Sequence, residues 1–224
     1  MKKIITIVLF QFFIIFLILS SGCKSNSTES SYSDELPADT THYSPYTRKP
    51  NIYIYPVKTC SLSVKIEFPL GGTIIKSIPY YENGWDVSVT PSGRINNEYD
   101  YLFYESINPE KYQYSKGWII RRDSLSIFFS NSLLEAGFNN HEKNDFIEYW
   151  IPRLIEYPYY IIYPELLEDI DKVIQLKFSV QPDKVLRLFY VIKGTEYPNL
   201  KLYAPIIPKF ERSGFVVTEW GVVM

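Results

Sequence analysis

Cysteine and histidine are both scarce in this chain of 224 residues, which contains two of each. Two cysteines exclude a disulfide-dense scaffold and a zinc or iron–sulfur centre built from thiolates. Neither sign of charge dominates, because 23 Lys and Arg face 25 Asp and Glu for a formal net charge of -2. The chain therefore lacks the concentrated basic surface that nucleic-acid binding normally requires. These scarcities predict no metal, no cofactor and no nucleic-acid partner.

The common catalytic motifs are also missing. The sequence contains no GxSxG, no GxGxxG and no P-loop. Cys60 stands at the start of an alternating segment with no histidine near it in sequence, so we interpret it as a small buried hydrophobe rather than a reactive thiol. Glu168, Asp169 and Asp171 lack the spacing and the glycine of a calcium loop, and we interpret them as a solvated turn.

One string of polar residues contains groups that could act in catalysis or bind a metal. The string His141-Glu142-Lys143-Asn144-Asp145, with Glu148 on the next turn, would place His141, Asn144, Asp145 and Glu148 along one side of a helix. A histidine beside carboxylates can act as a base or hold a metal. However, a metalloprotease helix needs a second histidine at the position that Asp145 occupies. We therefore favour the other interpretation, the polar first turn of an amphipathic helix whose dipole attracts carboxylates.

Aromatic residues are abundant, with 20 Tyr, 14 Phe and 4 Trp making up 17% of the chain. Tyr80, Tyr81 and Trp85 flank a turn and are the candidate ligand-binding residues, because aromatic faces with polar tips stack on sugars and anchor protein interfaces. A second group lies on one predicted strand: Tyr99, Tyr101, Phe103 and Tyr104. The alternative is that these residues only pack the sheet, where Tyr and Phe are common.

The first 23 residues resemble the signal peptide of bacterial lipoproteins. Lys2 and Lys3 precede an apolar run over 4–19, too short to span the hydrocarbon core of a bilayer, and small residues then lead to Cys23. The string Leu-Ser-Ser-Gly-Cys is similar to the lipobox of that family. This resemblance implies cleavage before Cys23 and diacylglycerol on its sulfur, and two or three acyl chains anchor a protein stably. An ordinary cleaved signal peptide and an uncleaved anchor helix are the alternatives.

Three regions follow from this interpretation. Residues 1–22 are predicted to be the signal peptide. Residues 23–48 are predicted to combine the lipidated cysteine with a disordered Ser/Thr-rich tether, because the segment has too few large apolar side chains to form a core. His42 lies in this tether and is interpreted as a polar residue without a functional role. Residues 49–224 are predicted to form a single β-rich globular domain.

Alternation of apolar and polar residues dominates the domain and predicts strands with one buried face. Val185–Ile192 is apolar on both faces and is expected to be a central strand. The other expected strands are 51–55, 61–68, 73–78, 85–90, 99–104, 118–121, 159–163, 174–180, 201–203 and 215–219.

A helical period interrupts the strands and predicts an αα-hairpin at about 124–156. Ser124 is expected to cap the first helix and Gly137 to end it, and Asn139 with Glu142 forms a capping-box pattern for the second. Pro152 is expected to kink or stop that helix. Residues 164–171 are expected to add a short helical turn. Strands, two helices and further strands define an α+β fold, a mainly antiparallel sheet or sandwich with an inserted hairpin.

Three strings resemble a family of uncharacterised bacterial envelope proteins that open with KPxIYxYP. They are Lys49–Pro56 (KPNIYIYP), Asn144–Pro152 (NDFIEYWIP) and Phe210–Phe215 (FERSGF), the last followed by Glu219-Trp220-Gly221. The resemblance spans most of residues 49–224. It implies a shared fold and no particular activity.

These observations predict a lipid-anchored protein of the cell envelope, on the cell membrane or outer membrane, with its domain outside the cytoplasm. We expect a binding or interaction module, for a glycan or another envelope protein, rather than an enzyme. One alternative is an anchored hydrolase that uses dispersed carboxylates such as Glu142, Asp145 and Glu148. The other is a structural envelope component.

Overall fold

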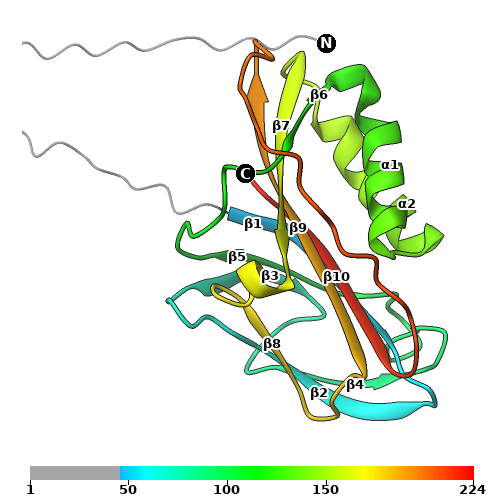
Figure 1. Cartoon of the computed structure of the whole chain (residues 1–224). Coiled ribbons are helices and arrows are strands. Elements are labelled where there is room, and N and C mark those ends of the chain that lie inside the picture. Colours follow the sequence, from blue (N-terminus) through cyan, green and yellow to red (C-terminus); the bar gives the residue numbers. More distant parts are fainter. Residues whose placement is uncertain (1–45) are drawn as a thin grey trace, which may run out of the picture. The chain divides into compact units, whose positions relative to one another are not determined.

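The computed structural model describes residues 46–224 and confirms the α+β class (Figure 1). Within this range ten strands form two sheets. The strands are β1 (Tyr46–Tyr55), β2 (Cys60–Glu67), β3 (Thr73–Ile78), β4 (Trp85–Val89), β5 (Leu102–Ile107), β6 (Trp118–Arg121), β7 (Tyr159–Leu166), β8 (Gln175–Phe178), β9 (Lys184–Thr195) and β10 (Val216–Val223).

The larger sheet has seven strands in the order β3-β5-β1-β10-β9-β7-β6. All neighbouring strands are antiparallel except β9 and β10, which run parallel. A parallel pair requires a long crossover connection, and residues 196–215 supply it. The strand β9 lies inside the sheet, as its two apolar faces predicted.

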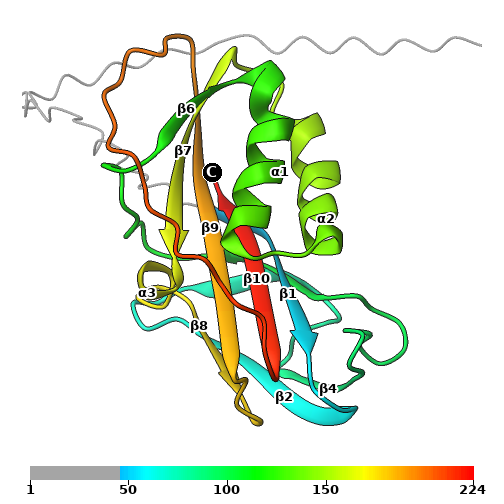
Figure 2. The same ribbon diagram turned by 45° about the vertical axis from the view of Figure 1, so that its right-hand side comes forward.

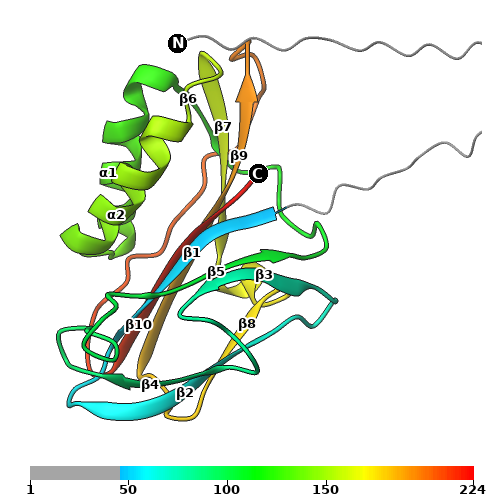
Figure 3. The same ribbon diagram turned by 180° about the vertical axis from the view of Figure 1, so that it is seen from behind.

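The smaller sheet, β4-β2-β8, is antiparallel and packs across one face of the larger one (Figure 3). Alternation along β1 divides the core between the two faces. Ile52 and Ile54 point into the cluster between the sheets, which includes Leu62, Val64 and Phe189. Tyr53, between them in sequence, points to the opposite face.

Two helices, α1 (Leu125–Ala136) and α2 (Asn140–Trp150), cover that opposite face (Figure 2). Their apolar rows bury Phe129 and Leu133 of α1 and Phe146 and Trp150 of α2 against the sheet. The helical stripe and the alternating strands thus produce three layers, with the larger sheet in the middle.

The sequence located most helix ends correctly. Gly137 ends α1 with a left-handed φ of 109°, and Asn139 and Glu142 form both bonds of the capping box of α2. The helix α2 stops at Trp150, just before a 3₁₀ turn, η2 (Ile151–Arg153), that contains Pro152. The capping role of Ser124 was wrong: its side chain makes no capping bond, because it ends another 3₁₀ turn, η1 (Arg122–Ser124).

Several strand limits also differ from the prediction. The strand β1 begins at Tyr46, within the range expected to be tether, and β5 begins at Leu102 rather than at residue 99. Residues 201–203 do not form a strand, and Tyr203 makes only an isolated bridge to Lys116. The short helix α3 (Leu167–Ile170) forms as expected.

The predicted signal peptide, Cys23 and tether residues up to 45 lie outside the described residues. Among residues 46–224, no helix has the length and apolar character needed to cross a membrane.

Candidate functional site

Lys49 occupies an unusual backbone position in β1. The pairing of β1 with both of its neighbours, β5 and β10, shifts register next to this residue. Lys49 has a φ of 53°, the left-handed region that a side chain rarely adopts, although Pro50 follows and favours extended backbone before it. Bulges and strained residues often re-aim a side chain at functional sites. The Lys49 side chain is therefore a candidate for a functional role.

The Lys49 ammonium is surrounded by aromatic rings and neutral acceptors. Its Nζ lies 3.1 Å from both the Asn51 Oδ1 and the Tyr101 hydroxyl oxygen. The same atom lies 4.5 Å from the ring centres of Tyr101 and Phe103 and 5.4 Å from that of Tyr149. Cations are attracted to ring faces at such distances. The bulge thus places a cation among three rings, two from the start of β5 and one from α2.

A surface pocket of about 340 Å³ opens at this ammonium. Its volume falls at the lower end of the range for small-molecule sites, roughly 300–1,000 Å³. We call it the Lys49 pocket, and it is lined by Lys49, Lys76, Ile78, Glu98, Tyr99, Asp100, Tyr101, Phe103 and Tyr149. Aromatic rings, donors and acceptors therefore converge on one small cavity.

Burial lowers the pKa of Lys49 to about 8, because water no longer fully solvates its charge. The carboxylates of Asp145 and Glu105 oppose this shift. Among the described residues, no Asp or Glu forms a salt bridge with Lys49. An ammonium has three N–H donors, and Lys49 uses two of them within residues 46–224. It is thus a partly buried charge without a direct counter-ion among the described residues.

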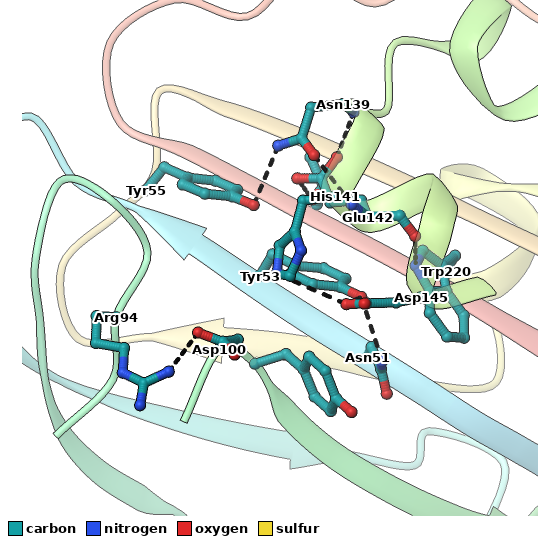
Figure 4. Close-up of polar contacts among 12 residues, drawn as sticks. Asn51, Tyr53, Tyr55, Arg94, Asp100, Asn139, His141, Glu142, Asp145 and Trp220 are labelled. Carbon is teal, nitrogen blue, oxygen red and sulfur yellow. Dashed lines mark hydrogen bonds and ion pairs between the residues drawn. The ribbon is translucent and has the colours of Figure 1, made fainter. Parts of the chain in front are cut away.

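A hydrogen-bonded chain links Lys49 to α2. Asn51 accepts from Lys49 and donates from its Nδ2 to the Tyr53 hydroxyl at 3.2 Å. That hydroxyl donates to the Asp145 Oδ2 at 2.8 Å, and burial raises the pKa of Tyr53 far above its usual value. Figure 4 shows Asn51, Tyr53 and Asp145 of this chain together with His141, whose Nε2 lies 3.7 Å from the same Asp145 oxygen.

Glu142, the neighbouring carboxylate of α2, has a structural role. Its side chain is 0% exposed, and Arg212 binds both of its oxygens at 3.0 Å. Thr218 and the backbone N–H of Asn139 also donate to it. With every acceptor site occupied, Glu142 cannot approach a substrate. The carboxylates of the hydrolase alternative are thus not equivalent: Asp145 lies in the chain to Lys49, and Glu148 is exposed.

The three aromatic residues predicted to bind a ligand do not form one exposed face. Tyr80 is 84% exposed, but Trp85 is only 3% exposed and its indole N–H donates to the carbonyl of Pro79. Tyr81 packs edge-on against Trp85 and accepts the backbone N–H of Ile66. Assigning Trp85 to a binding surface is therefore incorrect, because strand alternation turns its side chain into the core.

Sequence reasoning missed Lys49 as a site residue, although the signals were present. The strings KPNIYIYP and NDFIEYWIP meet here, since the first supplies Lys49, Asn51 and Tyr53 and the second supplies Asp145 and Tyr149. The second aromatic group also contributes, with Tyr99, Tyr101 and Phe103 lining the pocket. Only the register of the bulge, which a sequence does not display, brings these segments together.

A fully buried charge, Arg187, links the larger sheet to the segment before β8. Arg187 donates from Nε to Glu219 at 2.6 Å and from Nη1 to the carbonyl of Ile174 at 2.7 Å, and the Tyr104 hydroxyl donates to Glu219. Arg187 also pairs with Asp171, so this member of the predicted solvated turn has a structural contact. Arg187 and Glu219 lie inside the core, whereas the Asp171 side chain is 45% exposed.

Other candidates from the sequence carry no comparable arrangement. Cys60 lies on β2 as a free thiol. Its exposure is intermediate, so the residue is less buried than the sequence predicted. Between residues 46 and 224, no three His, Cys, Asp or Glu side chains gather where a metal could sit. A larger cavity of about 420 Å³ lies beside β9, but its floor is mainly apolar, from Leu166, Leu186 and Leu188.

Comparisons with protein-family models, curated proteins and solved structures find no match to this chain. The resemblances to lipoprotein signal peptides and to the KPxIYxYP envelope family therefore stay predictions.

Proposed function

We propose that this protein is a lipid-anchored binding module of the cell envelope whose ligand is a glycan held in the Lys49 pocket. The observation that carries the proposal is the composition of that pocket. Partly exposed tyrosines line it beside lysine and carboxylate groups. Aromatic rings cover the apolar faces of sugars, and the charged groups exchange hydrogen bonds with sugar hydroxyls.

The anchor and the display outside the cytoplasm rest on the sequence of residues 1–23 and are part of the same proposal. A glycan-binding domain tethered to a membrane would meet its ligand in the adjacent envelope. Mass spectrometry of the membrane-extracted protein tests the anchor: diacylglycerol on Cys23 is expected, and its absence would contradict this part. A Cys23→Ala chain is the control, and it should carry no lipid.

Ligand binding is tested by calorimetry on the full chain in mild detergent, against a panel of neutral and acidic oligosaccharides that includes cell-envelope glycans. Tyr101→Leu removes a pocket ring and a hydroxyl while keeping an apolar side chain. We expect it to weaken binding at least tenfold, equivalent to about 1.4 kcal/mol. The matched control is Tyr197→Leu, a tyrosine that is 72% exposed and does not line the pocket. Equal losses in both variants, or no binding by the wild type, would reject the proposal.

A further inference from the structure

We propose that the Lys49 pocket selects sugars that carry a carboxylate, with the Lys49 ammonium as their partner. This inference rests on the proposed function, since it names the class of glycan that the same pocket takes. Three observations support it: the coordination of Lys49, the balance of charge in the pocket and the position of the cation.

The coordination of Lys49 is incomplete. Both of its acceptors, Asn51 Oδ1 and the Tyr101 hydroxyl, are neutral, and one N–H has no acceptor within residues 46–224. The desolvated charge is costly in this state, as its lowered pKa indicates. A ligand carboxylate would supply the missing acceptor and the missing negative charge together. A charge-assisted hydrogen bond of this kind is about twice as strong as a neutral one.

The charge balance favours an acidic ligand over a basic one. Four charged side chains line the pocket, and one of them, Asp100, pairs with Arg94 at 2.6 Å. Of the other three, Lys49 and Lys76 are cations and Glu98 is an anion. The carboxylates of Asp145 and Glu105 act on Lys49 without forming a salt bridge with it, so a ligand carboxylate would be its first direct anionic partner beyond residues 46–224.

The fixed position of the Lys49 ammonium favours acidic sugars over neutral ones. Lys49 is held by the backbone bulge, by two hydrogen bonds and by three rings, so its ammonium is fixed before a ligand arrives. Preorganised groups lose little conformational entropy on binding. Burial also strengthens an ion pair, because less water screens it.

Selection should also depend on pH. The charged and titratable groups around Lys49 come from each packed element: Tyr101 before β5, Glu105 of β5, Lys76 of β3, Asp145 and Tyr149 of α2, and Arg153 of η2. As Lys49 loses its proton above pH 8, the affinity for an acidic sugar should fall while that for a neutral sugar stays constant.

The test compares trigalacturonate with its neutral counterpart, galactotriose, by calorimetry on the full chain at pH 6.5 and pH 9.5. We expect the wild type to bind the acidic sugar at least tenfold more tightly at pH 6.5, and Lys49→Met to lose that preference. The control Lys201→Met removes an exposed lysine that does not line the pocket, and it should keep the preference.

The outcomes separate the two proposals. Equal affinity for both sugars, or an unchanged preference in Lys49→Met, would overturn the selection of carboxylates and leave a glycan-binding pocket. Binding of neither these sugars nor any member of the wider panel would reject the glycan-binding function, and the inference with it. A misfolded Lys49→Met is recognised by its circular dichroism, and Lys49→Gln then takes its place, since it retains a hydrogen-bond donor without the charge.

Discussion

Two charged residues lie at the interface between α2 and the larger sheet, and their surroundings differ sharply. Glu142 is met by the guanidinium of Arg212, by a threonine hydroxyl and by a backbone N–H. Lys49 meets only neutral acceptors and aromatic rings, on strained backbone at the edge of a pocket. Glu142, with its acceptor sites occupied, joins α2 to the larger sheet, whereas Lys49, with one N–H unpaired among residues 46–224 at the edge of a pocket, is the charge that we propose a ligand meets. The following predictions test that contrast.

The largest effect is expected for Glu142→Ala. It removes a buried carboxylate, breaks the capping box and leaves Arg212 and Thr218 without their partner, so the free energy of unfolding should fall by about 3 kcal/mol. Urea unfolding measures the loss. Glu148→Ala on the exposed side of α2 is the control and should change it by less than about 0.5 kcal/mol. Similar losses in both variants would show that Glu142 has no special structural role.

Glu165 of β7 provides an intermediate case. It is buried, one of its oxygens has no hydrogen-bond partner within residues 46–224, and burial raises its pKa from 4.5 to about 8. Between these two pH values the folded state binds more protons than the unfolded state, so the free energy of unfolding should fall as pH rises from about 4.5 to about 8.

Glu165→Gln should reduce this dependence, since an amide does not titrate. At pH 9 the variant should be more stable than the wild type by about 1–3 kcal/mol, because only the wild type must then hold an ionised carboxylate in a buried position. Urea unfolding from pH 5 to pH 9 measures the slopes. Identical slopes in the two proteins would mean that Glu165 ionises freely in the folded state.

Lys49→Met should have a small effect on folding and a large one on binding. The lost hydrogen bonds and ring contacts are offset by removing a desolvated charge, so the free energy of unfolding should change by no more than about 1 kcal/mol. Thermal and urea unfolding check this. A loss comparable to that of Glu142→Ala would place Lys49 among the structural charges and erase the contrast.

His141→Ala is expected to have the smallest effect. The imidazole is 54% exposed and lies 3.7 Å from Asp145, which already accepts from Tyr53. Exposed ion pairs contribute little, and the change in the free energy of unfolding should stay below about 0.5 kcal/mol. A larger fall in the free energy of unfolding would mean that His141 supports the hydrogen-bonded chain from Lys49 to Asp145.

Local pattern was enough to predict the fold class, the hairpin and most of the ends of its helices, because capping residues and apolar periods act over a few positions. Gly137 and the pair Asn139–Glu142 are examples. The parallel pairing of β9 with β10 was not predicted, since it depends on a crossover that has no regular structure of its own.

The site was less predictable for the same reason. Its residues come from β1, β3, β5, α2 and the loop before β5, and a bulge that depends on strand register brings them together. Aromatic abundance indicated a binding role but selected Tyr80, Tyr81 and Trp85. Alternation alone would have placed Trp85 inside, since it precedes the buried Val87 and Val89 on the same face of β4.

The pKa of Lys49 tests the central claim most directly. Titration of the lysine side chains by nuclear magnetic resonance, with Lys49→Met to assign the signal, follows this one ammonium in the full chain. We predict a pKa near 8 in the free protein and a clear rise when trigalacturonate binds. A pKa near the ordinary value of 10.5 that does not respond to the sugar would contradict the account, since Lys49 would then be a solvated surface charge.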